Sequence, residues 1–271
     1  AGIAQEMRRD GLENVRGELL VFTDSNAPNG KVIRIDVDPG QLTRNALPEV
    51  AILSDAGFAL QALERELEDY DVDQAKARAQ ALREQLQGLL DKRQRLHQRF
   101  MVAVQQALPG VIVVGDSTQP VYSANLFYEP EQPRSYFNSS TGYGTLGYAL
   151  PAALGAKLAR SERPVVALIG DGGLQFTMGE LATAVELALP LPILLWNNRG
   201  YGEIKRYMAE RSIPQIGVDI YTPDFLTIAR GFGCRAERAE TLGQLRQLLR
   251  QARQAAGPTL IEIDEEAALA W

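Results

Sequence analysis

The sequence predicts an α/β protein: a doubly wound, mostly parallel sheet flanked by helices, preceded by the tail of a second α/β domain. Two short apolar runs, Val165–Ile169 and Ile193–Trp196, have the composition of buried parallel strands. Between them, Gly179–Leu189 has helical length and an apolar face, and Pro190 and Pro192 end it. A strand, a helix and a second strand in this order are typical of a parallel sheet with a right-handed crossover.

The other expected elements follow the chain. Strands are expected over 18–22, 31–37, 111–114 and 259–264, and helices over 58–67, 148–159, 223–230 and 242–255. Residues 71–107 have helix-forming composition, which we interpret as a charged connector followed by the first helix of the next domain. A boundary near residue 92 divides the chain into 1–92, the C-terminal portion of one domain with its linker, and 93–271.

Composition excludes several classes of function. The chain has 271 residues, 45% of them hydrophobic, which is enough for a sizeable core. Its net charge of −6 with no basic block argues against nucleic acid as a partner. No apolar run has membrane length and no signal peptide is visible, so we expect a cytoplasmic protein without a membrane partner. The single cysteine, Cys234, is expected in the core, and the single histidine, His97, is expected in solvent.

Polar side chains follow the two central strands where each ends. Asp171 comes after the first strand and Asn198 after the second, so both are expected at one edge of the sheet, where ligands bind in open α/β folds. A carboxylate, an amide and a backbone carbonyl are hard ligands that suit Mg²⁺. Gly170, Gly172 and Gly173 let backbone N–H groups approach phosphates closely. The pattern predicts a metal–diphosphate site.

The same residues resemble a known family. Gly170-Asp171-Gly172, twenty-four positions and then Asn197-Asn198 are similar to the signature of thiamine-diphosphate-dependent enzymes, in the acetolactate synthase and benzoylformate decarboxylase group. The resemblance implies the thiamine-diphosphate-binding fold, with thiamine diphosphate and Mg²⁺ as cofactors. It implies that Asp171, Asn198 and the carbonyl of Gly200 bind the metal. Tyr201 and Gly202 continue the cofactor-binding loop, which in the family closes over the active site.

Two further loops are candidates for cofactor contact. The resemblance places a diphosphate contact at Ser117, Thr118 and Gln119, although a polar turn explains each residue equally well. Gly142–Gly147 matches G-x-G-x-x-G, but no strand leads directly into it, which argues against dinucleotide binding. In the family this stretch meets the aminopyrimidine ring, with Gly144 offering its carbonyl, Thr145 beside it and Leu146 beneath the bent cofactor. An ordinary core leucine remains the alternative for Leu146.

The resemblance also implies an activity. A family member removes carbon dioxide from a 2-oxo acid and then protonates the product or transfers it to an acceptor. No catalytic residue is expected in this chain, because the activating glutamate belongs to the pyrimidine-binding domain, contributed across the interface of a homodimer or homotetramer. We therefore expect the chain to be inactive alone. Decarboxylase, acetolactate synthase-type carboligase and non-catalytic cofactor-binding module remain open, and the run GYGEIKRYM favours a basic substrate such as 5-guanidino-2-oxopentanoate. Glu203 in that run is expected to be a solvated acid at a helix start.

Overall fold

The computed structural model describes residues 32–44, 47–67, 73–141 and 143–271. The chain divides into two compact units, residues 1–85 and 86–271. The predicted strand over 18–22 lies outside the described residues, and the functional division at residue 92 stays a prediction.

The first unit pairs two short parallel strands, β1 and β2, in a register that sets Ile33 opposite Val50. Asp38 caps the helix after β1, because its side chain accepts the backbone N–H of Gly40. The elements that begin in this unit are β1 (Ile33–Asp36), α3 (Pro39–Leu42), β2 (Val50–Leu53), α4 (Ala56–Glu66) and α5 (Asp73–Leu89).

The second unit is built on a six-stranded sheet in which every pair of neighbours is parallel, in the order β4-β3-β5-β6-β8-β7. Its strands are β3 (Ile112–Gly115), β4 (Tyr136–Asn138), β5 (Val165–Gly170), β6 (Pro192–Asn197), β7 (Arg235–Arg238) and β8 (Thr259–Asp264). Its helices are α6 (Lys92–Ala107), α7 (Gln119–Phe127), η1 (Ser139–Thr141), α8 (Ala149–Ala159), α9 (Asp171–Thr177), α10 (Glu180–Glu186), α11 (Gly202–Glu210), α12 (Phe225–Gly231), α13 (Leu242–Arg253) and α14 (Glu265–Ala268). The predicted fold class is confirmed.

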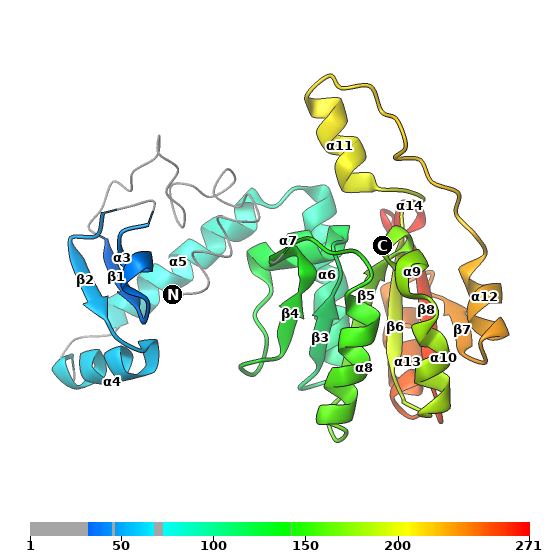
Figure 1. Cartoon of the computed structure of the whole chain (residues 1–271), viewed down its shortest axis with the longest axis horizontal. Helices are drawn as coiled ribbons and strands as arrows, with labels where there is room; N and C mark the ends of the chain where they lie inside the picture. The colour runs from blue at the N-terminus through cyan, green and yellow to red at the C-terminus, as the bar shows by residue number, and fades with distance from the viewer. Residues whose placement is uncertain (1–31, 45–46, 68–72, 142) are drawn as a thin grey trace. The chain divides into compact units, whose positions relative to one another are not determined.

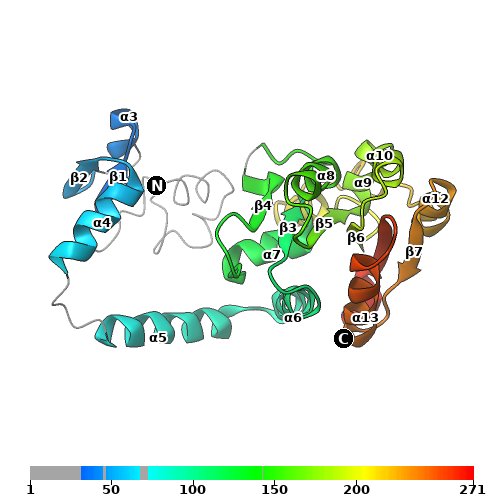
Figure 2. The same cartoon turned by 90° about the horizontal axis from the view of Figure 1, so that it is seen from below.

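Helices cover both faces of this sheet, which explains why its central strands are continuously apolar. Alternate residues of β5 enter two separate cores: Val166 and Leu168 join one, and Ala167 and Ile169 join the other. Figures 1 and 2 show α6 and α13 on the first face and α8, α10 and α12 on the second.

The order of the strands fixes where a ligand can sit. After β3 the chain goes outward to β4, and it then returns to the other side of β3 to form β5. The loops that follow β3 and β5 therefore leave the sheet in different directions, and in open α/β sheets ligands bind at the carboxyl edge beside such a change of direction. Asp116 begins one of these loops and Asp171 follows the end of β5.

Some elements differ from those predicted. The glycine-rich segment after β5 forms a helix that was not predicted, because Gly170 is the N-cap and Asp171 begins α9. The single helix expected over 179–189 is preceded by α9 and is itself shorter, since α10 ends at Glu186. The short edge strands β4 and β7 were not predicted at all.

His97 is fully buried, contrary to the prediction that it lies in solvent. It belongs to the apolar face of α6, and its ring packs edge-on against Trp196 with the centroids 5.0 Å apart. Its Nδ1 lies 2.7 Å from Ser123 Oγ. The arginines and glutamines of α6 hid this face, because they lie between its apolar positions.

Two other expectations can be compared with the structure. Cys234 is a buried free thiol, as predicted for a small core residue. Of the helices in the described part of the chain, none is both long enough and apolar enough to cross a membrane.

Candidate metal and diphosphate site

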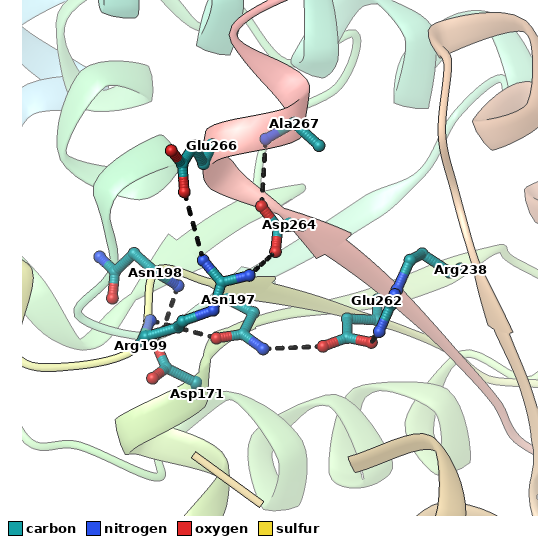
Figure 3. A network of polar contacts seen from close by, with 9 residues as sticks. All are labelled: Asp171, Asn197, Asn198, Arg199, Arg238, Glu262, Asp264, Glu266 and Ala267. Carbon is teal, nitrogen blue, oxygen red and sulfur yellow. Dashed lines mark hydrogen bonds and ion pairs between the residues drawn. The ribbon is translucent and has the colours of Figure 1, made fainter. Parts of the chain in front are cut away.

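Asp171 and Asn198 meet at the carboxyl edge of the sheet. They follow β5 and β6, which are neighbours with Gly170 opposite Trp196. The backbone N–H of Asn198 lies 3.4 Å from Asp171 Oδ1 (Figure 3). The parallel pairing of these two strands therefore brings the two predicted ligands together.

The side-chain amide of Asn198 contacts both Asp171 and Gly200. One terminal atom of its amide lies 3.1 Å from Asp171 Oδ1 and 2.8 Å from the carbonyl oxygen of Gly200. The amide nitrogen at that position donates to both oxygens and so joins Asp171 to Gly200. An amide that turns over presents its oxygen instead, and a carboxylate, an amide and a carbonyl oxygen would then face a bound cation.

The carboxylate of Asp171 is poorly satisfied by the protein. Asp171 is 1% exposed, and its Oδ2 has no hydrogen-bond partner. Burial raises the pKa of Asp171, and backbone N–H groups led by that of Asn198 offset part of this rise. A bound cation stabilises the charged form of such a group. Within the described residues no three His, Cys, Asp or Glu side chains form a metal cluster, so a metal here depends on the amide and carbonyl oxygens. Oxygen donors of these three kinds fit Mg²⁺.

The loop after β3 lies against the same edge. A Cβ added to Gly170 would sit 3.0 Å from Thr118 Oγ1, so Thr118 packs directly on the end of β5. Ser117 Oγ lies 3.1 Å from Ser139 Oγ. Gln119 begins α7, and its side chain donates to Glu203 Oε2 at 2.9 Å. Thr118 and Gln119 are buried and Ser117 is partly exposed. Of the three candidates, Ser117 thus presents its hydroxyl nearest to solvent.

The glycine-rich stretch before α8 approaches the loop after β3 at one of its residues, Gly144. A Cβ at Gly144 would lie 3.9 Å from Ser117 Oγ, so Gly144 joins the cluster of loops. Thr145 is exposed and Leu146 is half-buried. Gly144 and Gly147 both have a positive φ, at 67° and 84°. The 3-10 turn Ser139–Thr141 separates β4 from this stretch, so no strand runs directly into the G-x-G-x-x-G run.

The segment after Asn198 covers the site. A Cβ at Gly172 would come within 2.7 Å of Tyr201 Cε1, and a Cβ at Gly202 within 2.5 Å of Asn198 Nδ2. These glycines are therefore needed for the chain to pass this closely. Glu203 is half-buried, pairs with Arg206 and accepts the bond from Gln119, so the prediction of a solvated acid was wrong.

Some polar residues of this edge were not singled out from the sequence. Asp116 is fully buried and accepts the backbone N–H of Ala149 at 3.0 Å, which fixes the start of α8. Burial raises the pKa of Asp116, and backbone N–H bonds led by that of Ala149 offset part of the rise. Glu262 lies on β8, beside the edge strand β7, and is 4% exposed. An acid between Ile261 and Ile263 was the available signal, because such residues are rarely buried without a partner.

Residues 115–263 match the family model described as the C-terminal TPP-binding domain of thiamine pyrophosphate enzymes. The chain belongs to this family. The match covers more than half of the chain and contains every residue of the site described above. The fold of the second unit is therefore that of a thiamine pyrophosphate-binding domain.

Several known proteins are similar to this member of the family. A probable 2-ketoarginine decarboxylase of Pseudomonas aeruginosa is 40% identical over 87% of this chain and 43% of its own length. A probable acetolactate synthase large subunit of Methanocaldococcus jannaschii is 29% identical over 93% of this chain and 44% of its own length. The solved 4-hydroxybenzoylformate decarboxylase of Rhodococcus jostii, which is thiamine diphosphate-dependent, superposes with a TM-score of 0.69 at 26% identity, over 88% of this chain and 45% of that one. The chain thus spans less than half the length of these relatives.

Proposed function

We propose that this chain is the part of a longer enzyme that binds Mg²⁺ and the diphosphate of thiamine diphosphate, and that the enzyme decarboxylates a 2-oxo acid. The observation that carries the proposal is the buried, unpartnered Oδ2 of Asp171 beside the side-chain amide of Asn198 and the carbonyl oxygen of Gly200. Asp171, Asn198 and Gly200 are the proposed metal ligands. When bound, the cofactor supplies the electron sink for loss of carbon dioxide.

The chain's own residues bind and orient the cofactor. We assign diphosphate contacts to Ser117, Thr118 and Gln119, and to the backbone of Gly170, Gly172 and Gly173. Gly144, Thr145 and Leu146 are proposed for the aminopyrimidine side, and Tyr201 and Gly202 for the covering loop. Because Tyr201 lies over Gly172, movement of this loop would expose or cover the diphosphate end. The proposed partners are a pyrimidine-binding domain that carries the activating glutamate and a second subunit, in a cytoplasmic homodimer or homotetramer.

Three alternatives remain: a decarboxylase of a basic 2-oxo acid, a carboligase and a non-catalytic module. The similarity to the 2-ketoarginine decarboxylase favours a basic 2-oxo acid such as 5-guanidino-2-oxopentanoate as the substrate. The similarity to acetolactate synthases favours a carboligase, which would form acetolactate from pyruvate where a decarboxylase forms an aldehyde. A non-catalytic module would bind the cofactor without turnover of either substrate.

The test of the metal site is calorimetric titration of the longer enzyme with thiamine diphosphate at a series of Mg²⁺ concentrations. We expect cofactor binding to depend on Mg²⁺. Removal of a residue that only orients a metal ligand lowers metal affinity by roughly 10- to 100-fold, and we expect Asp171→Ala to weaken binding by more than this. Glu237→Gln is the matched control, because Glu237 is an exposed acid on β7. Binding of wild-type strength by Asp171→Ala, with the same Mg²⁺ dependence, would contradict the assignment.

A further inference from the structure

The turn that carries two of the proposed metal ligands is held from the neighbouring strand. Asn197 ends β6 opposite Asp264 of β8. Its Nδ2 donates to Glu262 Oε1 at 2.7 Å, and its Oδ1 accepts the backbone N–H of Arg199 at 3.1 Å (Figure 3). One amide thus connects β8 to the residue that lies between Asn198 and Gly200.

Glu262 is itself fixed at both oxygens. Its Oε2 accepts bonds from Arg238 Nε at 3.2 Å and from Arg238 Nη2 at 2.8 Å. Its side chain is 5% exposed, whereas that of Arg238 is 54% exposed. Because the guanidinium holds one oxygen, the other oxygen has a fixed position for Asn197. The row Arg238, Glu262, Asn197 runs from β7 across β8 to β6, as Figure 3 shows.

The backbone of the turn needs this support. Arg199 has a φ of 59°, in the left-handed region that a residue with a side chain rarely adopts. Its guanidinium pairs with Asp264, whose Oδ1 accepts the N–H of Ala267 at 3.0 Å and so caps α14. The left-handed residue is therefore held at its N–H by Asn197 and at its side chain by Asp264.

The conformation of Arg199 decides where the flanking ligands point. With Arg199 in this conformation, the side-chain amide of Asn198 and the carbonyl oxygen of Gly200 lie 2.8 Å apart beside Asp171. Relaxation of Arg199 toward ordinary backbone angles would swing the carbonyl of Gly200 away from Asn198.

We propose that Glu262 is a positioning residue for the metal site: acting through Asn197, it holds Asn198 and Gly200 in the arrangement that the cation requires. This inference rests on the proposed function, because it assigns to Glu262 the support of ligands that the proposal names. Glu262 touches neither the cation nor the diphosphate. Its effect is on Mg²⁺ affinity, and it takes no part in the chemical step.

The test measures the apparent dissociation constant of Mg²⁺, by calorimetry at saturating thiamine diphosphate, in the longer enzyme. We expect Glu262→Gln to raise it by roughly 10- to 100-fold. The glutamine fills the same volume, but it cannot accept from Asn197 and Arg238 together. Glu237→Gln again serves as the control, since it removes an equal charge from the exposed side of β7.

A double-mutant cycle separates positioning from a general loss of stability. If Glu262 acts through Asn197, then Asn197→Ala weakens Mg²⁺ binding by a similar factor, and adding Glu262→Gln to it weakens binding little further. Melting of the metal-free proteins shows whether each variant is folded, and Asn197→Ala tests the same hydrogen bond if Glu262→Gln does not fold. Additive effects in the cycle, or wild-type Mg²⁺ affinity in a folded Glu262→Gln protein, would overturn the inference while leaving the proposed function intact. If thiamine diphosphate binding by the wild-type enzyme does not depend on Mg²⁺, the proposed function is overturned instead.

Discussion

Asp171 shows at the scale of one residue why a carboxylate in the core indicates a cation. Transfer of an ionised carboxylate out of water costs several kcal/mol, roughly, unless charge or hydrogen bonds replace the lost hydration. The backbone N–H groups around Asp171 offset only part of this cost, since its Oδ2 has no partner. A divalent ion beside Asn198 and Gly200 would complete the compensation. Under the proposed function, we therefore expect the same residue to destabilise the metal-free fold and to strengthen metal binding.

His97 gives a prediction about pH at the same scale. Burial lowers its pKa from 6.5 to about 4, with a further decrease from Arg93 and a small opposing effect from Asp91. The folded protein therefore favours the neutral ring. Its contribution to stability is complete above about pH 6.5, and it is lost as the pH falls toward 4, by up to about 3 kcal/mol. We expect the free energy of unfolding to fall over this range.

The measurement is urea unfolding at several pH values for the wild type and for His97→Leu. Carboxylates make the free energy of unfolding depend on pH in both proteins. The difference between the two curves of unfolding free energy against pH therefore reports His97 alone. Ser123→Ala serves as the control, because it removes the partner at Nδ1 and keeps the titrating ring buried. Parallel curves for the wild type and His97→Leu would show that His97 does not titrate as proposed.

At the scale of elements, position in the sheet determined what the sequence could reveal. The buried strands β5 and β6 were predicted within a residue or so because their residues are apolar on both faces, and β8 was predicted from its alternating residues. The segment after β5 was misread because glycines at 172 and 173 disfavour a helix. Packing overrides that preference here: Tyr201 lies close over Gly172, and a Cβ at Gly173 would sit 3.0 Å from Asp116 Oδ1. These contacts come from segments distant in sequence, so local composition could not indicate them.

The glycines before α8 provide a matched pair of substitutions. Gly144 and Gly147 both have a positive φ, so alanine strains the backbone by about 1 to 2 kcal/mol at either position. Only at Gly147 does the added Cβ also clash, at 2.8 Å from Thr177 Cγ2, which adds about 1 to 3 kcal/mol. Thermal and urea unfolding should therefore show that Gly147→Ala is clearly less stable than Gly144→Ala. Equal losses of stability in the two variants would mean that Thr177 moves aside without cost.

At the scale of the whole molecule, the sequence predicted the arrangement of the site better than the edges of the sheet. The proposed ligands Asp171 and Asn198 follow buried strands, so knowing those strands was enough to predict that the two residues meet. The edge strand β4 has three residues and β7 reads Arg-Ala-Glu-Arg, which carry no strand pattern of their own. The support from Glu262 could not be predicted, because it depends on β8 lying beside β6. That order is a property of the complete sheet.

The last prediction concerns how much of the reaction this chain performs. The chain spans 43 to 45% of the relatives described above, and the proposal assigns the activating glutamate to another domain. We therefore expect the longer enzyme to release carbon dioxide from a 2-oxo acid, and the 271-residue chain to fold but release none. The assay supplies 5-guanidino-2-oxopentanoate and pyruvate separately, with thiamine diphosphate and Mg²⁺, and identifies the products. An aldehyde from the guanidino acid supports the decarboxylase, and acetolactate from pyruvate supports the carboligase. Measurable turnover by the 271-residue chain would contradict this expectation, because the groups that bind the diphosphate would then suffice for catalysis.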